Sequence, residues 1–410
     1  MNKLYRFAKY TIILSIIPSV IYSFFPGKIV ASTIICSYPL LILLPSIYKN
    51  IDKSDLDPLT KKIFHLFFVS NCIMMAHGFI NLNEVQDYME LISNQLIYVF
   101  FIPFSLYFGL NNLLISGLIN YYLRYTLPIT FLILFNQSDS VGIISFPYLI
   151  YPIMFFLLIG PYLNPKSFII MIIFSLMVMY YYIDRRSVFL NFFITLLIVS
   201  TYYYKSYKIL SLMKYLRVTF LITPIVFLYL GISDDINVFK VVEDYQTVST
   251  LEIGKDGRIA TVDSRTSIYQ DVLQDIEKKS AYIFGLGFNG KVTTSLGELD
   301  GYEDLFNKGR SNSESAMLNY LQWGGLIGVL SYYLLFWIAS YFALFKSKNW
   351  FCVMTGLWIS FKLTFSFIDD VISFNPSTIF LFMTLGICFN STIRQMNEID
   401  FKNYIKKLMI

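Results

Sequence analysis

The amino-acid sequence predicts an all-α polytopic membrane protein with about 12 transmembrane helices and one long extracytoplasmic loop. Of the 410 residues, 56% are hydrophobic and 14% are charged, a balance typical of membrane proteins. Runs of about 18 or more mainly apolar residues, long enough to cross a hydrocarbon core of about 30 Å, recur along the chain. Lysines and arginines gather in alternate short loops, which predicts an orientation for each run.

Twelve segments have the hydropathy of spans. The first begins with basic residues and lacks a small-residue cleavage pattern, so we expect an uncleaved anchor. The fifth is short, contains Pro128 and follows an interfacial helix expected near Leu113. The predicted spans are Ile12–Phe25, Ile29–Tyr48, Ile63–Ile80, Leu91–Leu110, Tyr121–Phe135, Ile143–Gly160, Phe168–Ile183, Val188–Tyr204, Val218–Leu230, Ala316–Phe345, Trp350–Ile368 and Ile372–Phe389.

The basic loops predict that both termini are cytoplasmic, because cytoplasmic loops carry an excess of lysine and arginine. We therefore expect a transmembrane bundle of about nine spans at 1–230, an extracytoplasmic loop domain at 231–315, about three more spans at 316–393, and a basic cytoplasmic tail at 394–410. The 231–315 segment has more acidic than basic residues, which argues against nucleic acid as a partner.

Two arginines depart from this charge rule. Arg185 and Arg186, in "YYIDRRSVF", lie in an outer turn, where cations are disfavoured. One interpretation is a tolerated exception in which Asp184 neutralises one of them. The other, which we favour, is an anion site at the outer surface, because arginine offers a planar fork of donors suited to phosphate oxygens.

An amphipathic helix is predicted in "TVDSRTSIYQDVLQDIEKKS". Ile268, Val272 and Ile276 recur every four residues and give one apolar stripe, which would lie on the rest of the loop or on the membrane-facing rim. Arg265 falls in the first turn, where the helix dipole disfavours a cation. It is therefore either a surface arginine or one recruited by an anionic partner.

Two further motifs follow. The glycines of "AYIFGLGFNG" lack the spacing of a phosphate-binding loop and predict tight turns. In "GRSNSESAMLNYLQWGGLIGVL", Ser311 and Glu314 have the spacing of a capping box before a long apolar helix. Glu314 near Arg310 is also a candidate general base, because a carboxylate at an outer helix end would be ionised and oriented.

Lys362 is an ionisable residue inside a predicted span. It lies seven residues before Asp369, so the two are expected on one helix face with Ser366 between them. Two interpretations remain open, namely a structural Lys–Asp pair and a cation that lines an outward-facing cavity.

The pattern resembles the Wzy-type O-antigen and capsular polysaccharide polymerases and the related O-antigen ligases of bacterial envelopes. The shared features are the expected number of spans, the single late outer loop, "SRTSIYQDVL…FGLGFNG" and "ESAMLNYLQWGGLIGVL". The resemblance covers the architecture of the whole chain but motifs over only about 60 residues. Related ligases carry a histidine near the position of Glu314, whereas both histidines here, His65 and His77, lie in the third span.

The resemblance implies a GT-C-like, membrane-embedded glycosyltransferase that polymerises repeat units carried on undecaprenyl pyrophosphate, at the outer face of the bacterial cytoplasmic membrane. It maps the family's loop arginine onto Arg265 and its short-loop arginine onto Arg185 or Arg186. Charge developing on the pyrophosphate leaving group needs stabilisation, which Arg185, Arg186, Arg310 and Lys362 would give without a metal or cofactor. Arg265 and Glu314 are the expected catalytic residues.

The donor and acceptor would both be undecaprenyl-pyrophosphate-linked glycans, with a flippase and a chain-length regulator as candidate protein partners. Alternatives are an O-antigen ligase or another lipid-linked glycan transferase, and a lipid-linked oligosaccharide flippase. The sequence shows no pair of similar halves of the kind common in transporters, which disfavours the flippase.

Overall fold

The fold is described from a computed structural model of the chain. The structure describes residues 3–24, 29–51, 53, 56–82, 85–135, 147–183, 186–232, 264–293, 309–313, 315–370 and 374–409. Within these ranges the regular elements are helices, and Val292 and Arg310 form one antiparallel β-bridge. The prediction of an all-α chain is therefore confirmed for the described residues.

Most of the helices coincide with apolar runs in the sequence, whereas Ser264–Lys278 and Glu398–Leu408 are amphipathic. Before the long hydrophilic segment they are α1 (Lys3–Phe24), α2 (Ile29–Lys49), α3 (Pro58–Gly78), α4 (Val85–Glu90), α5 (Ile102–Ser105), α6 (Asn112–Tyr121), α7 (Leu127–Phe135), α9 (Pro152–Ile159), α10 (Pro165–Tyr181), α11 (Arg186–Ser200) and α12 (Tyr207–Ile232). The later ones are α14 (Ser264–Lys278), α16 (Ala316–Phe345), α17 (Trp350–Phe365), α18 (Pro376–Phe389), α19 (Ser391–Gln395) and α20 (Glu398–Leu408). Turns of π-helix occupy Leu91–Gln95, Ile97–Phe101 and Tyr122–Thr126, and 3-10 turns occupy Phe79–Asn81, Leu106–Leu110 and Gly160–Tyr162.

Five of the described helices are long and apolar enough to cross a membrane, or six if a pair bent by 105° is one span. Five more apolar helices have only 10–17 residues, whereas crossing a core of about 30 Å takes about 20. The structure is thus that of a helical membrane protein, but it does not support the predicted 12 spans or a GT-C-like fold. Hydropathy overcounted because apolar residues continue beyond helix ends, as in the predicted span Trp350–Ile368, where α17 ends at Phe365. The long helices are Lys3–Ile21, Ala31–Lys49, Pro58–Asn81, Tyr207–Val226 and Ala316–Phe345.

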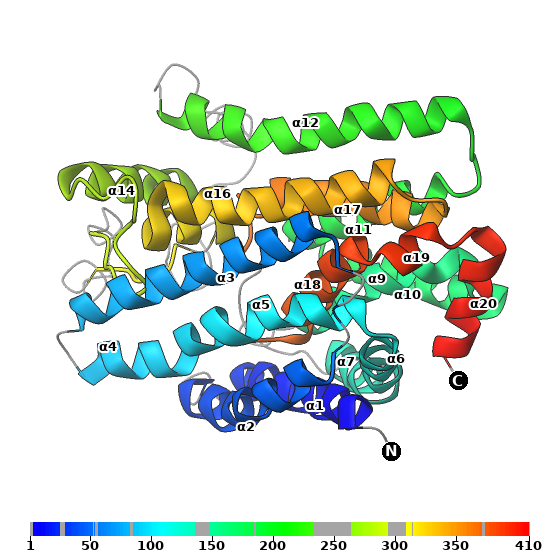
Figure 1. Cartoon of the computed structure of the whole chain (residues 1–410), viewed down its shortest axis with the longest axis horizontal. Helices are drawn as coiled ribbons and strands as arrows, with labels where there is room; N and C mark the ends of the chain where they lie inside the picture. Colours follow the sequence, from blue (N-terminus) through cyan, green and yellow to red (C-terminus); the bar gives the residue numbers. More distant parts are fainter. Residues whose placement is uncertain are drawn as a thin grey trace.

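The helices form a bundle with two distinct ends. Helices α3, α12 and α16 run along the longest axis of the molecule, and α14 lies at one end of them (Figure 1). Both chain termini and α20 lie at the opposite end, which we call the termini end (Figure 1). The assignment of the termini end to the cytoplasm stays a prediction.

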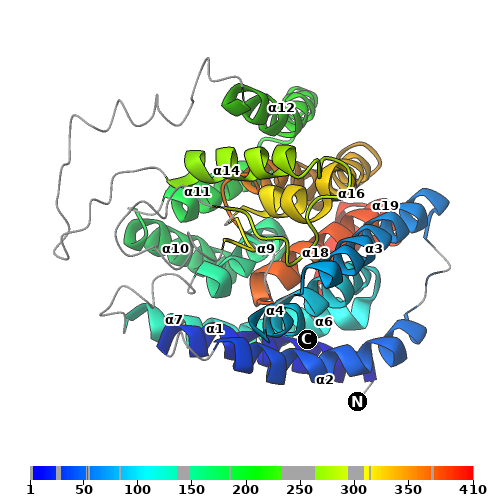
Figure 2. The ribbon, with the colours of Figure 1, turned by 90° about the vertical axis from the view of Figure 1, so that its left-hand side faces the viewer.

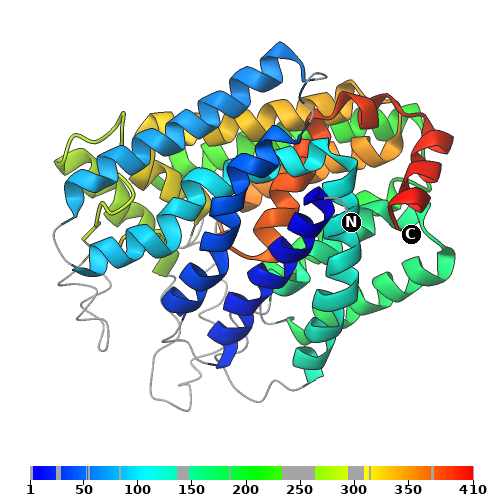
Figure 3. The same cartoon turned by 60° about the horizontal axis from the view of Figure 1, so that its bottom comes forward.

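Helix α16 is central to the packing. It contacts α3, α17 and α18, while α1 packs against α2 and α6 on one side of the molecule (Figure 3). Helix α12 lies on the opposite side and reaches the bundle mainly through α17 (Figure 2). The interior between these helices is apolar and rich in phenylalanine and tyrosine.

Asparagine begins many of these helices. Its side-chain oxygen accepts backbone N–H groups of the first turn, which would otherwise lack a partner in lipid. Two of the caps are followed by proline at the first helical position, where a missing N–H has no consequence. The capping residues are Asn111, Asn164, Asn349, Asn375, Asn390 and Asn397.

The predicted basic tail folds back on the bundle as α20. Glu398 accepts hydrogen bonds from the Tyr162 hydroxyl at 2.8 Å and from the backbone N–H of Trp350 at 2.7 Å. It also pairs with Lys205 at 3.3 Å. Phe401 stacks on Phe351, with 4.6 Å between the ring centroids. One carboxylate and one aromatic face therefore join α20 to three other parts of the chain.

Candidate functional site

Helix α14 buries its apolar stripe against the protein itself. The stripe packs against the segment after the helix and against α16, at the end of the bundle shown in Figure 2. The amphipathic helix is confirmed, and its support is the rest of the hydrophilic segment together with α16. The buried residues of the cluster are Ile268, Val272, Ile276, Leu286, Val292 and Leu318.

A buried carboxylate fastens α14 to the strand-like stretch that follows. Asp275, 3% exposed, accepts hydrogen bonds from the Thr293 backbone N–H at 2.9 Å, the Thr293 hydroxyl at 2.8 Å and the Lys279 ammonium at 3.2 Å. Burial acts to raise the pKa of Asp275, but the hydrogen bonds from Thr293 and Lys279 outweigh it and lower that pKa below its ordinary value. The group therefore stays ionised at neutral pH and acts as a structural tie.

The glycine-rich turns complete a break in α16. At Gly325 the helix backbone leaves helical geometry, with φ 55° and ψ −144°. An unbroken helix would join the carbonyl of residue 322 to the N–H of 326 and that of 323 to 327. Instead, the Gln322 and Trp323 carbonyls accept from the backbone N–H groups of residues 286 and 287, at 2.7 and 3.0 Å. The N–H groups of residues 326 and 327 donate to the carbonyls of residues 282 and 283, at 2.8 and 3.2 Å. All four groups freed by the break thus have partners.

Only glycine fits at the two contacting turns. Gly285 and Gly287 have φ values of 66° and 77°, in the left-handed region, so tight turns at these glycines are confirmed. A Cβ atom on Gly285 would lie 2.5 Å from the backbone nitrogens of Gly324 and Gly325. One on Gly287 would lie 2.5 Å from the backbone nitrogen of Gly78, at the end of α3. The turns therefore pack backbone against backbone at two helices.

Polar side chains hold the same segment to α4 and to the π-helical turn that follows α4. The Gln95 side chain donates to the Phe288 carbonyl at 3.0 Å, and that of Asn289 donates to the Asp87 carbonyl at 3.1 Å. Lys291 pairs with the Asp87 carboxylate at 2.8 Å. The described part of the predicted loop domain is thus built into the end of the bundle.

The predicted capping box before α16 is wrong. The N-cap is Ser315, four residues after Ser311, and its side chain does not cap the helix. The first N–H groups of α16 instead donate to backbone carbonyls of the turn after α17: Ala316 to Asp369 at 3.2 Å and Met317 to Ser366 at 3.0 Å. The Ser315 hydroxyl also donates to the Ser366 carbonyl at 3.0 Å. Carbonyls distant in sequence therefore replace the local cap.

Lys362 lies in a buried site between α9, α11 and α17. Its ammonium group donates to the side-chain oxygen of Asn191 at 2.7 Å, and the whole residue is 3% exposed. The Lys362 nitrogen lies 4.9 Å from the ring centroid of Tyr151 and 5.5 Å from those of Trp358 and Phe365. Aromatic faces attract cations, so these three rings offset part of the loss of hydration.

Asp369 does not share a helix face with Lys362, because α17 ends at Phe365 and Asp369 lies in the following turn. Tyr151 links the two residues. Its hydroxyl donates to the Asp369 carboxylate at 3.3 Å, while its ring faces the Lys362 ammonium. The buried lysine and the partly exposed carboxylate therefore belong to one polar cluster at the α14 end.

Tyr269 of α14 completes this arrangement. Its hydroxyl donates to the Phe367 carbonyl and lies 3.4 Å from the Ser315 hydroxyl. A small pocket opens between α14, the beginning of α16 and the turn after α17. Its lining residues are Ile268, Tyr269, Ser313, Ser315, Leu318, Phe367 and Ile368.

Four of the predicted catalytic and pyrophosphate-binding side chains lie outside the described part of the structure. Arg265 lies one turn before Tyr269 on α14, and Arg186 is the first residue of α11; the structure describes the backbone of both but not their side chains. Arg185 and Glu314 lie outside the described residues.

Arg310 is held through its backbone. Its N–H and carbonyl pair with Val292 at 2.8 and 3.0 Å, and the carbonyl also accepts from the Gln322 side chain at 2.9 Å. This fixes the main chain of Arg310 beside the break in α16. Of the predicted pyrophosphate ligands, Arg310 and Lys362 are therefore the two whose surroundings the structure describes.

Sequence reasoning missed Asn191, Tyr151 and Tyr269. Asn191 and Tyr151 each carry one polar group in an apolar run. Neither can be recognised as part of a site until the fold shows that it contacts Lys362. Tyr269 lies beside the apolar stripe of α14 and looks like a core residue in sequence.

The comparisons with known proteins add no relative: no family model matches the chain, and neither does any curated protein or solved structure.

Proposed function

We propose that this protein polymerises oligosaccharide repeat units, carried on undecaprenyl pyrophosphate, into O-antigen or capsular polysaccharide. One observation carries the proposal. The segments on which the family resemblance rests, namely α14, the glycine turns and the beginning of α16, meet at one end of an apolar helix bundle. They meet beside the buried cluster of Lys362, Tyr151 and Asp369.

In the proposed reaction, a sugar hydroxyl of the acceptor attacks the anomeric carbon of the donor, and the bond from that carbon to the pyrophosphate oxygen breaks. Negative charge grows on the pyrophosphate, and preorganised cations stabilise it most effectively where water is excluded. Arg265, with Arg185, Arg186, Arg310 and Lys362, provides these cations. Lys362 is deeply buried and donates to Asn191, so in this proposal it acts on the site through Tyr151 and Asp369.

A carboxylate takes the proton from the attacking hydroxyl. Glu314 is the proposed base, and Asp369 offers a second carboxylate that the Tyr151 hydroxyl already orients. Because pyrophosphate is an activated leaving group, positioning of two lipid-tethered substrates supplies a large share of the rate.

The proposed location is the bacterial cytoplasmic membrane, with the α14 end outside and both termini in the cytoplasm. A flippase that delivers the lipid-linked unit and a chain-length regulator are the proposed partners. An O-antigen ligase or another transferase uses the same donor with a different acceptor and remains the second candidate, because it needs the same cations.

The test is complementation of a deletion strain, with surface glycan resolved on a ladder gel. The strain receives wild type or one of Arg265→Ala, Arg186→Ala, Glu314→Gln and Lys362→Met, with matched membrane levels. Lys402→Ala, on the exposed face of α20 at the termini end, is the control. We expect single repeat units in place of the ladder for the deletion and the arginine variants, and a normal ladder for the control. A ladder that persists in the deletion strain, or repeats trapped on the inner face, would refute polymerisation. Full-length polymer left on its lipid carrier would favour the ligase.

A further inference from the structure

A buried arginine lies between α12 and α16, far from the α14 end. Arg217 is 4% exposed. Its Nε donates to the Ser340 hydroxyl at 2.9 Å and its Nη2 donates to the Trp337 carbonyl at 2.8 Å. The guanidinium carbon lies 5.1 Å from the ring centroid of Trp337 and 5.9 Å from that of Tyr341. Its known partners are thus neutral.

A second cation, Lys214, lies over the Phe345 ring, which Arg217 also contacts. Lys214, one turn earlier on α12, has its ammonium 5.1 Å from the ring centroid of Phe345, and the Arg217 guanidinium carbon lies 5.6 Å from that centroid. The two charges are therefore no more than about 11 Å apart, close enough to repel each other in a medium of low dielectric. Partial burial strengthens this repulsion.

Among the described residues, no carboxylate forms an ion pair with Lys214 or Arg217. The ion pairs found there use Lys205, Lys279, Lys291 and Arg394, and neither Lys214 nor Arg217 takes part in one. The hydrogen bonds and aromatic rings around Arg217 offset only part of its lost hydration, and they leave the charges of the two neighbouring cations uncompensated. The arrangement therefore calls for an anion from outside the described chain.

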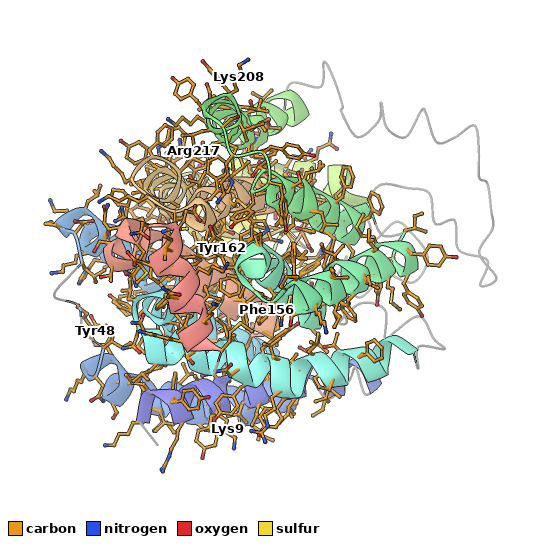
Figure 4. All side chains as sticks on the ribbon, turned by 90° about the vertical axis from the view of Figure 1, so that its right-hand side faces the viewer. Lys9, Tyr48, Phe156, Tyr162, Lys208 and Arg217 are labelled. Carbon is orange, nitrogen blue, oxygen red and sulfur yellow. The ribbon has the colours of Figure 1, made fainter. Side chains whose placement is uncertain are left out.

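The position of Lys214 and Arg217 in the bundle indicates the source of such an anion. Helix α16 ends at Phe345, beside Lys214 and Arg217, so the pair lies toward the termini end of the bundle. Figure 4, which looks at that end, shows Arg217 and Lys208 on the outer helix α12, on the side of the molecule away from Lys9. Tyr215 and Tyr341 are exposed nearby, as aromatic residues at a lipid headgroup level are.

We propose that Lys214 and Arg217 form a binding site for the headgroup phosphate of an anionic glycerophospholipid, seated between α12 and α16 in the leaflet at the termini end. Basic pockets between transmembrane helices on the cytoplasmic side favour such headgroups. The Arg217 Nη1, which forms no hydrogen bond within the described residues, would donate to a phosphate oxygen, and the half-buried Lys214 adds a mobile point charge. Trp337 and Phe345 give apolar surface to the glycerol and upper acyl region. The site does not depend on the proposed polymerase activity.

The test uses the purified full-length protein in a zwitterionic detergent, titrated separately with phosphatidylglycerol, phosphatidylcholine and a polyprenyl phosphate. Native mass spectrometry counts the bound lipid. The variants are Arg217→Gln, Arg217→Lys and Lys214→Gln, and the control is Lys402→Gln on the exposed face of α20, at the same end.

We expect phosphatidylglycerol to bind at least about tenfold more tightly than phosphatidylcholine, because the choline cation of the latter cancels the phosphate charge and is repelled by Lys214 and Arg217. Arg217→Gln should lose about that factor and Lys214→Gln a smaller one, with Arg217→Lys between wild type and Arg217→Gln and the control unchanged. Equal binding of the two phospholipids, or an equal loss in the control, would overturn the proposal. Preferential binding of the polyprenyl phosphate would overturn the choice of occupant. If Arg217→Gln does not fold, unchanged binding by Lys214→Gln is enough to reject the site.

Discussion

Replacing Gly285 with alanine should separate the hydrophilic segment from α16. Alanine in the left-handed region costs about 1–2 kcal/mol. Its Cβ would also lie 2.5 Å from the backbone nitrogens of Gly324 and Gly325, which cannot move aside as a side chain can. The turn must therefore shift, and the two hydrogen bonds that the Gln322 and Trp323 carbonyls accept would be lost.

Each of those bonds is worth about 1 kcal/mol net, and more where the freed group is buried in an apolar setting. The expected loss in the free energy of unfolding is therefore about 3–4 kcal/mol. Phe284→Ala is the matched control, because the neighbouring side chain is 51% exposed and alanine keeps the backbone allowed.

The free energy of unfolding of both variants is measured on the purified protein in mixed micelles with increasing sodium dodecyl sulfate. Circular dichroism reports the helix content. Limited proteolysis in the folded range adds a local readout, since the displaced turns of Gly285→Ala should be cut faster than those of wild type. If Gly285→Ala and Phe284→Ala unfold together with wild type, the turns do not support α16 and the reasoning fails.

Three other changes test separate contacts. The pKa of Asp275 in the folded protein lies below its unfolded value of about 3.9, so the stabilising contribution of Asp275 is complete above that value and is lost as the pH falls through the folded pKa. The difference in the free energy of unfolding between wild type and Asp275→Asn should therefore be large at pH 6 and small toward pH 3. A difference that grows on acidification would contradict the assignment. Ser315→Ala should lower the free energy of unfolding by about 1 kcal/mol, because it removes the hydrogen bond to the Ser366 carbonyl; an unchanged free energy of unfolding would contradict that role. Glu398→Ala should lose about 2 kcal/mol with its two hydrogen bonds, whereas Glu398→Gln should lose about 1 kcal/mol, because an amide keeps only one of the two acceptor oxygens and the pair with Lys205 is partly exposed; equal losses would contradict this division.

Patterns local in sequence were predictable. The period of four in α14 placed its buried face, because a helix returns to the same side within that spacing. Apolar runs located the helices, but not how many of them cross a membrane, because hydropathy counts residues in turns together with those in the helix.

Contacts between distant parts of the chain were not predictable. The pair Gly324–Gly325 lies in an apolar run that has the composition of an uninterrupted helix, and only the approach of residues 282–287 makes a break tolerable. The cap of α16 comes from carbonyls some 50 residues away, so a local serine was the wrong place to look for it. The sequence marks Lys362 as an ionisable residue within an apolar run, but its partner Asn191 lies on another helix.

The break in α16 has a consequence for biogenesis. A membrane helix normally carries its hydrogen-bond ladder with it and can leave the insertion machinery by itself. Helix α16 lacks two rungs of that ladder until residues 282–287 pack against the break. The unfilled break would expose two carbonyls and two N–H groups to lipid. Maturation of this helix must therefore wait for a segment outside the helix itself, and protection of the glycine turns from proteases should appear together with the final packing of α16.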